Sequence, residues 1–119
     1  MPWFAAHVIM SVRFKDGDQD KFPVWENIIL IEARTDKEAW HKAEARGKMD
    51  EGDSQGTFTW GGRPATWALA GIRKLIMCDY LGARPEDGLE VSYSEFELLT
   101  QEDLQKLVDG SLVDVTYVE

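Results

Sequence analysis

The stretch VWENIILIEARTDKEAWHKAEARG, residues 24–47, predicts a strand that leads directly into a capped helix. Its first half is rich in isoleucine and other residues typical of strands. Thr35 and Glu38 form a capping box, in which the Thr35 hydroxyl accepts from the Glu38 amide and the Glu38 carboxylate accepts from the Thr35 amide. We therefore expect a helix that begins at about Asp36 and ends where Gly47 adopts a left-handed conformation.

The predicted helix has one face suited to packing against a sheet. Ala39, Trp40 and Ala43 recur at three- and four-residue spacing, which is the period of a helix face. The small alanine side chains allow a close approach to a sheet, and the Trp40 indole supplies apolar area. This helix is therefore expected to cover one face of the sheet.

The residues before this stretch predict a strand that pairs with it. Residues 3–14 alternate, and one face carries only apolar side chains: Phe4, Ala6, Val8, Met10, Val12 and Phe14. A polar turn at 15–21 contains an Asp-Gly step, and the second strand follows Pro23. We expect the two strands to form an antiparallel hairpin.

The middle of the chain contains a loop and a long apolar segment. Residues 48–66 predict a loop with one short edge strand at 57–60. Residues 65–78 fit either a long strand or a helix that begins at Pro64, and we favour the strand, with Gly71 at a bulge or at a close approach of another backbone.

The last third predicts a strand, a helix and a closing strand. Asp87-Gly88 is expected to turn the chain into a partner strand at 89–98. Thr100 is a helix N-cap, and Gly110 ends that helix after Asp109. A closing strand is predicted at 112–118. The whole chain, 1–119, is expected to form a single α+β domain with a mainly antiparallel sheet of about five strands and two helices, in the order ββα(β)ββαβ.

Composition restricts the classes of function. The chain has 119 residues, 44% of them hydrophobic, and a formal charge of −9. Residues 84–119 hold ten acidic and only two basic residues, so a phosphate backbone would be repelled and we expect no nucleic-acid partner. No apolar run is long enough to span a membrane, and no signal peptide is evident. The single cysteine fits a reducing compartment, so a cytoplasmic location is expected.

Short patterns along the chain resemble a family of small bacterial proteins known only as a domain of unknown function. The shared residues are Trp3-Phe4-x-Ala6, Glu26-x-Ile28-x-Leu30-x-x-Ala33-x-Thr35-x-x-Glu38-Ala39, Gly71-Ile72, and Asp87-Gly88-x-Glu90-Val91 with Ser94. The resemblance spans residue 3 to about residue 94. It implies a compact α+β domain and no particular activity.

Metal binding and cysteine chemistry find little support. Residues 16–20 resemble the start of an EF-hand loop, but Lys21 stands where that loop needs glycine and Asn27 where it needs glutamate. A solvated hairpin turn is the better interpretation. Nothing in the sequence brings Cys78 together with His7 or His41 as a nucleophile and a base. We expect no metal, no cofactor and no catalytic residue.

The tryptophans offer a candidate binding site. Five tryptophans exceed what a core of this size needs, and Trp60 lies beside Gly61-Gly62-Arg63, with Trp67 close in sequence. An exposed indole beside an arginine suits an acidic or planar ligand. The alternative is that Trp60 only closes the edge of the core.

Three functional hypotheses remain. The first is a non-catalytic binding module that forms a homodimer or a larger homo-oligomer through its sheet. The second is an immunity-type neutraliser of a basic partner protein, using acidic residues such as Glu95 and Glu97. The third is a small-molecule enzyme that uses the Trp60–Arg63 loop.

Overall fold

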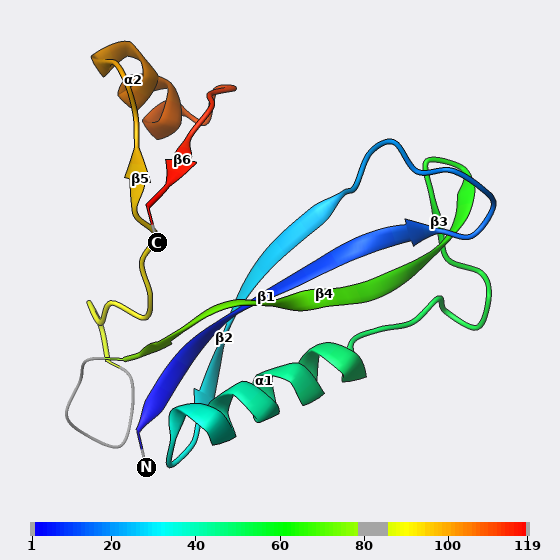
Figure 1. The fold of residues 1–119 in the computed structure, drawn as a ribbon, viewed down its shortest axis with the longest axis horizontal. Coiled ribbons are helices and arrows are strands. Elements are labelled where there is room, and N and C mark those ends of the chain that lie inside the picture. Colours follow the sequence, from blue (N-terminus) through cyan, green and yellow to red (C-terminus); the bar gives the residue numbers. More distant parts are fainter. Residues whose placement is uncertain (1, 79–85, 119) are drawn as a thin grey trace.

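The computed structural model describes residues 2–78 and 86–118 and shows an α+β fold with antiparallel sheets (Figure 1). The elements are β1 (Trp3–Phe14), β2 (Val24–Glu32), α1 (Asp36–Met49), β3 (Thr59–Trp60), β4 (Arg63–Met77), β5 (Phe96–Glu97), α2 (Gln101–Asp109) and β6 (Thr116–Tyr117). One sheet has the strand order β2-β1-β4-β3, and β5 pairs with β6 in a second, small sheet. The predicted fold class is confirmed.

The predicted hairpin and the long third strand are both present. β1 pairs antiparallel with β2, with His7 opposite Ile28 and Ile9 opposite Glu26. β1 also pairs antiparallel with β4 over eleven residue pairs, so the strand interpretation of residues 65–78 is confirmed and the helical alternative is wrong. The pairing shifts on both sides of Gly71, as expected for a bulge at this glycine.

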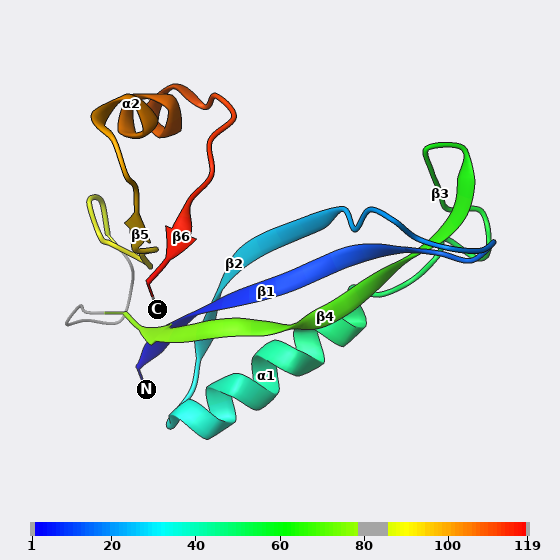
Figure 2. The ribbon, with the colours of Figure 1, turned by 45° about the horizontal axis from the view of Figure 1, so that its top comes forward.

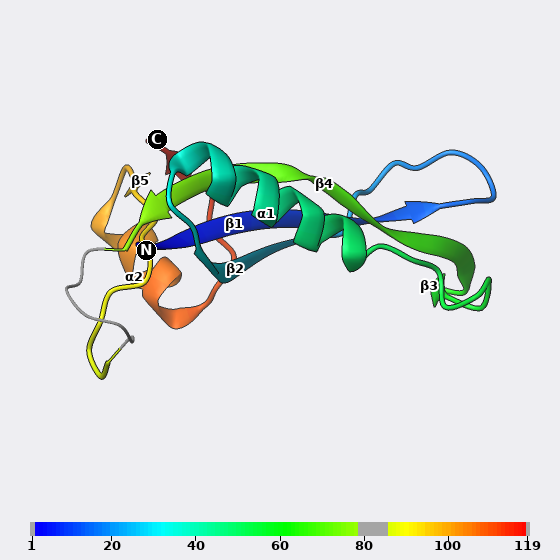
Figure 3. The same cartoon turned by 90° about the horizontal axis from the view of Figure 1, so that it is seen from below.

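The core lies between the sheet and α1, which runs along one face of it (Figure 3). The buried residues of β1 that face α1 are Phe4, Ala6, Val8, Met10 and Val12. Ala6, Val8 and Met10 pack in one cluster with Ala43, and Phe4 packs in another with Ala33 and Ala39. The alternation in residues 3–14 therefore places one face of β1 against the helix.

Gly47 does not end the helix, contrary to the sequence prediction. α1 continues to Met49, and Asp50 is its C-cap in a right-handed conformation. Gly47 is buried within α1, and a Cβ atom there would lie 2.7 Å from Leu69 Cδ1 on β4. The helix and the sheet approach each other closely at this glycine, and a side chain there would require the Leu69 side chain to shift.

The last third differs from the sequence prediction in its strands but not in its helix. Only Phe96–Glu97 of the predicted strand 89–98 is extended and paired, and its partner is β6 instead of β4. The closing strand is likewise reduced to Thr116–Tyr117. Instead of pairing with β4, the segment before β5 contacts the sheet through side chains, with Ser92 hydrogen-bonded to His7. α2 has its predicted Thr100 cap and its left-handed Gly110.

The segment β5–α2–β6 stands apart from the sheet, on the side opposite α1 (Figure 2). The radius of gyration is 17.3 Å, whereas a compact chain of this length has a value of about 13.5 Å. Within the described residues, no side chain of α2 is buried. None of the helices described is both long and apolar enough to cross a membrane.

The Thr35 cap is formed as predicted, but the Glu38 carboxylate bonds to the amide one residue before Thr35. The Glu38 amide donates to Thr35 Oγ1 at 3.1 Å, while the Glu38 carboxylate accepts from the Arg34 amide at 3.3 Å instead of from Thr35. The side-chain cap satisfies a backbone donor that the first helical turn leaves without a partner.

Replacing Thr35 tests this cap. Thr35→Ala should lower the free energy of unfolding by about 1 kcal/mol, whereas Thr35→Ser and Thr35→Asp should lower it little, because both keep an acceptor oxygen. Chemical denaturation of the three variants measures the difference. Equal stabilities of the Ala and Ser variants would show that packing alone fixes the junction.

Candidate binding sites and a buried histidine network

The structure brings Trp60 and Trp67 together at the end of the sheet where β3 and β4 meet. Gly61 and Gly62 form the turn between these strands, with φ of 58° and 80°. Trp25 contacts both indoles edge to face, with ring centroids 5.2 Å from Trp60 and 4.7 Å from Trp67. Trp60 keeps 39% of its surface exposed. Three indoles, one of them accessible to solvent, therefore form one cluster.

Arg63 faces the hairpin turn between β1 and β2. Its Nε donates to Asp16 Oδ1 at 3.0 Å, and its Nη2 donates to the Asp18 carbonyl at 3.1 Å. The guanidinium also lies 4.0 Å from the centroid of the Phe14 ring. These bonds give the polar turn a structural role, and they occupy donors that the sequence prediction assigned to a ligand.

A cleft opens beside the two indoles. It has a volume of about 470 Å³ and is lined by Asp50, Glu51, Gly52, Ser54, Phe58, Trp60 and Trp67. Aromatic rings and carboxylates therefore share its walls. Within the described part of the chain, no lysine, arginine or histidine lines it.

Glu95 and Glu97 lie far from this cleft, in the segment β5–α2–β6 at the other end of the molecule (Figure 1). The Glu95 carbonyl accepts from the Val118 amide at 3.1 Å, and Glu97 pairs with Thr116 in the small sheet. The structure thus separates the predicted binding residues into two groups. Their roles in binding stay predictions.

A buried histidine network is the feature that sequence reasoning missed. His7 is 1% exposed on the sheet face opposite α1, and its Nδ1 lies 2.7 Å from Glu26 Oε2. His7 Nε2 is hydrogen-bonded to Ser92 Oγ, and Arg73 Nη1 donates to the same Glu26 oxygen at 3.1 Å. Because a carboxylate only accepts, Nδ1 carries a proton and donates it. In the neutral ring Nε2 then accepts from the Ser92 hydroxyl.

The network shares its order of serine, imidazole and carboxylate with the relays that activate nucleophilic serines. It differs from them in its surroundings, because Arg73 neutralises Glu26 and the imidazole is enclosed. Its evident effect is structural, since it fastens the segment around Ser92 to the centre of the sheet. Arg73 extends this attachment, with its guanidinium 3.8 Å from the centroid of the Tyr117 ring.

Cys78 lies on the same sheet face as His7 but is not its partner. The Cys78 amide donates to the Trp3 carbonyl, which places the thiol about four residues, or roughly 13 Å, along β1 from His7. Its Sγ is 3.5 Å from the Val91 carbonyl, and burial raises the pKa of the thiol. A raised pKa disfavours the thiolate that nucleophilic chemistry requires.

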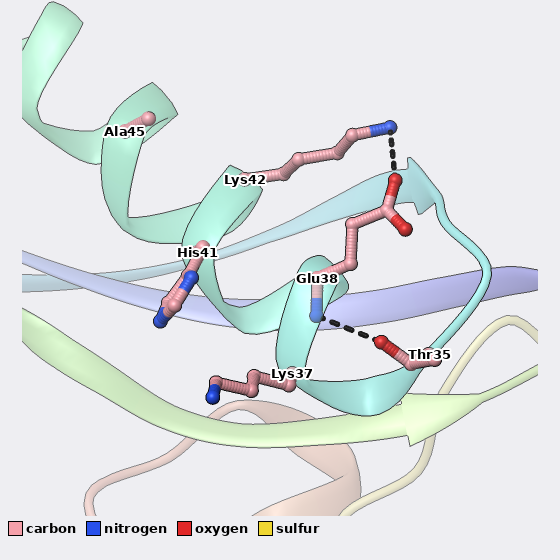
Figure 4. Close-up of a pocket in the computed structure, with 6 residues that line it drawn as sticks. All are labelled: Thr35, Lys37, Glu38, His41, Lys42 and Ala45. Carbon is pink, nitrogen blue, oxygen red and sulfur yellow. Dashed lines mark hydrogen bonds and ion pairs between the residues drawn. The ribbon is translucent and has the colours of Figure 1, made fainter.

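The outer surface of α1 has a shallow hollow (Figure 4). It is lined by Thr35, Lys37, Glu38, His41, Lys42 and Ala45. Lys42 pairs with Glu38 at 3.4 Å, and His41 and Lys37 lie on the other side of the hollow. The Glu38–Lys42 pair joins successive turns of the helix, and the polar side chains around the hollow do not converge on one point. Among the described residues, no cluster of histidine, cysteine and acidic side chains is arranged to hold a metal ion.

The fold and the sites together define a small α+β protein in which one helix covers one face of an antiparallel sheet. A family model described as a domain of unknown function (DUF4288) matches residues 3–92. The chain belongs to this family. The match ends at Ser92, so β5, α2 and β6 lie beyond it. No curated protein and no solved structure matches the chain.

The histidine network predicts a loss of stability in acid. Burial raises the pKa of Glu26, but hydrogen bonds from His7 and Arg73 lower it more, so that the pKa lies below its usual value of 4.5. A lowered pKa contributes stability that is present above the unfolded-state value and is lost as pH falls through the folded-state value. Glu26→Gln should therefore be less stable than wild type at pH 7, and the gap should narrow below about pH 4.5.

Urea denaturation of both proteins across this pH range measures the gap. Glu90→Gln, which changes an exposed carboxylate outside the network, is the control. A gap for Glu26→Gln that stays constant from pH 7 to pH 3 would contradict the assignment.

Proposed function

We propose that the protein is a non-catalytic interaction module that forms a homodimer through the free edge of β2. The observation that carries this proposal is an exposed apolar strand edge. Among the described strands, β2 has a neighbour only on its β1 side. On it Val24, Ile28 and Leu30 keep 54%, 50% and 39% of their surface exposed. A long, flat and apolar edge favours pairing with another chain.

The backbone of β2 is arranged for this pairing. The Pro23 carbonyl and the Ala33 amide bond inward, to Val12 and Pro2 respectively. Backbone groups alternate along a strand, so those of the even-numbered residues from Val24 to Glu32 point outward. Of these, the Glu32 carbonyl accepts from Lys42 Nζ at 2.7 Å.

A groove beside the edge adds apolar area. It runs between β2 and α1 and is lined by Ile29, Leu30, Ile31, Lys42, Ala45, Arg46 and Met49. Met49 is 75% exposed at its end. A second copy related by a two-fold axis would extend the sheet and bury this groove together with its own equivalent, as an isologous interface requires. Stable interfaces bury about 800 Å² on each partner.

Charge selects the register of the proposed pairing. With Ile28 on the two-fold axis, Glu26 lies opposite Leu30 of the second copy, and Val24 lies opposite Glu32. A shift that places Ile29 on the axis brings Glu26 opposite Glu32, and directly opposed like charges are destabilising. The pairing centred on Ile28 avoids this contact and is the register that we propose.

Three lysine substitutions test the interface and its register. Ile28→Lys places two lysines opposite each other and should convert the dimer to a monomer. Leu30→Lys places each lysine opposite Glu26 and should leave the dimer intact. Val108→Lys is the matched control, since Val108 is a 72% exposed apolar residue on α2. Light scattering at tens of micromolar should give twice the 13.5 kDa chain mass for wild type, Leu30→Lys and Val108→Lys. A wild-type monomer, or dissociation by Val108→Lys alone, would contradict the proposal.

A second candidate function is the neutralisation of a basic partner protein. It is supported by the segment β5–α2–β6, which stands apart from the sheet and holds five acidic residues against one basic residue. The Trp60–Arg63 enzyme hypothesis has less support, because Arg63 is bonded to the hairpin turn.

Charge reversal tests the neutraliser. If the acidic segment binds a basic protein, association should be fast and should weaken steeply with salt. Pull-downs at low and high salt should then lose the partner with Glu95→Lys/Glu97→Lys, while Glu44→Lys on α1 retains it. Retention of the same partner by the double variant at both salt concentrations would exclude this function.

A further inference from the structure

The cleft beside Trp60 and Trp67 combines aromatic walls with negative charge. Phe58, Trp60 and Trp67 supply three ring systems, and Asp50 and Glu51 supply two carboxylates. Aromatic faces attract cations through their negative π-surface, and carboxylates attract them directly. Both contributions favour a positively charged ligand.

The carboxylates retain much of their charge for a ligand. Asp50 is 3.8 Å from Arg46 Nε, at the outer limit of an ion pair, and its side chain is 54% exposed. Glu51 Oε2 accepts from the Leu69 amide at 2.8 Å. This bond places the Glu51 carboxylate without neutralising it, and in the described part of the chain no basic side chain is paired with Glu51.

The walls of the cleft are held in place before any ligand arrives. Gly52 and Trp67 exchange two backbone hydrogen bonds, of 3.0 and 2.8 Å. The Phe58 amide donates to the Asp53 carbonyl at 2.8 Å, which closes the loop on its other side. Trp25 supports Trp60 and Trp67 from behind through edge-to-face contacts. A preformed site loses little conformational entropy on binding.

We propose that this cleft binds an alkylammonium group, supplied either by a small quaternary amine or by a lysine side chain. The volume of about 470 Å³ accommodates a trimethylammonium head group. The charge is opposite to the one that Trp60 beside Arg63 suggested in the sequence, because the Arg63 guanidinium is bonded to Asp16 and the cleft is lined by acids. This binding site is separate from the proposed self-association.

Titration with choline and a neutral isostere tests the charge requirement. In two-dimensional NMR spectra, choline should shift the indole N–H signals of Trp60 and Trp67, with a Kd on the order of a millimolar. The compound 3,3-dimethylbutan-1-ol has the same shape without the charge and should bind at least about tenfold more weakly. Peptides that carry one lysine or one norleucine form the second arm. Binding by choline alone identifies a small amine, and binding by the lysine peptide alone identifies a side chain.

Matched variants locate the site. Trp60→Leu and Glu51→Gln should each weaken choline binding by about tenfold or more, and the Gln variant keeps the acceptor for the Leu69 amide. Trp40→Leu is the control, since Trp40 is 38% exposed on α1 and Trp60 is 39% exposed. The proposal is overturned if the isostere binds as tightly as choline, if neither choline nor the lysine peptide shifts these indoles at tens of millimolar, or if Trp40→Leu weakens binding as much as Trp60→Leu.

Discussion

The close contact between α1 and the sheet is the constraint on which the rest of the structure depends. Ala39, Ala43 and Gly47 are the buried residues of α1, and their four-residue spacing aligns them along one side of the helix. Leu69 of β4 lies where a side chain on Gly47 would be. A helix seated so closely buries β1 on one face, but it provides little apolar area of its own. The other sheet face and the edge of β2 are not covered by α1, so other contacts must stabilise them.

The other face is held by polar contacts instead of a second helix. His7 lies at its centre, and Glu26, Arg73 and Ser92 connect three separate segments through it. Buried polar groups of this kind stabilise one arrangement because each loses free energy when its partner is removed. This explains how a segment with few paired backbone groups stays on the sheet while β5, α2 and β6 extend beyond it.

Local signals in the sequence predicted most helices and strands. The features that the sequence did not predict depend on contacts between segments that are far apart in the chain. Thr35 and Thr100 act on amides three residues away, so a cap can be read directly from the sequence. Gly47 was misread because a glycine at a helix end and a glycine at a close contact look alike until Leu69 is placed opposite. Ser92 and His7 are 85 residues apart, and they meet only when the segment after β4 folds back onto the sheet. The sequence placed Trp60 and Trp67 close together, whereas the acidic lining of the cleft beside them depends on Asp50 and Glu51, and the bonds of Arg63 depend on the distant hairpin turn.

The alternation of β2 connects the two surfaces proposed for binding. Its odd-numbered residues face α1 and begin with Trp25, which supports the indoles of the cleft. Its even-numbered residues expose Ile28 and Leu30 on the opposite face. In a dimer centred on Ile28, the two Trp25 residues would be six positions apart along the paired strands, or roughly 20 Å. Two cation-binding clefts would then be held by one continuous sheet, so a ligand with two suitably spaced ammonium groups would gain affinity by avidity without any new contact.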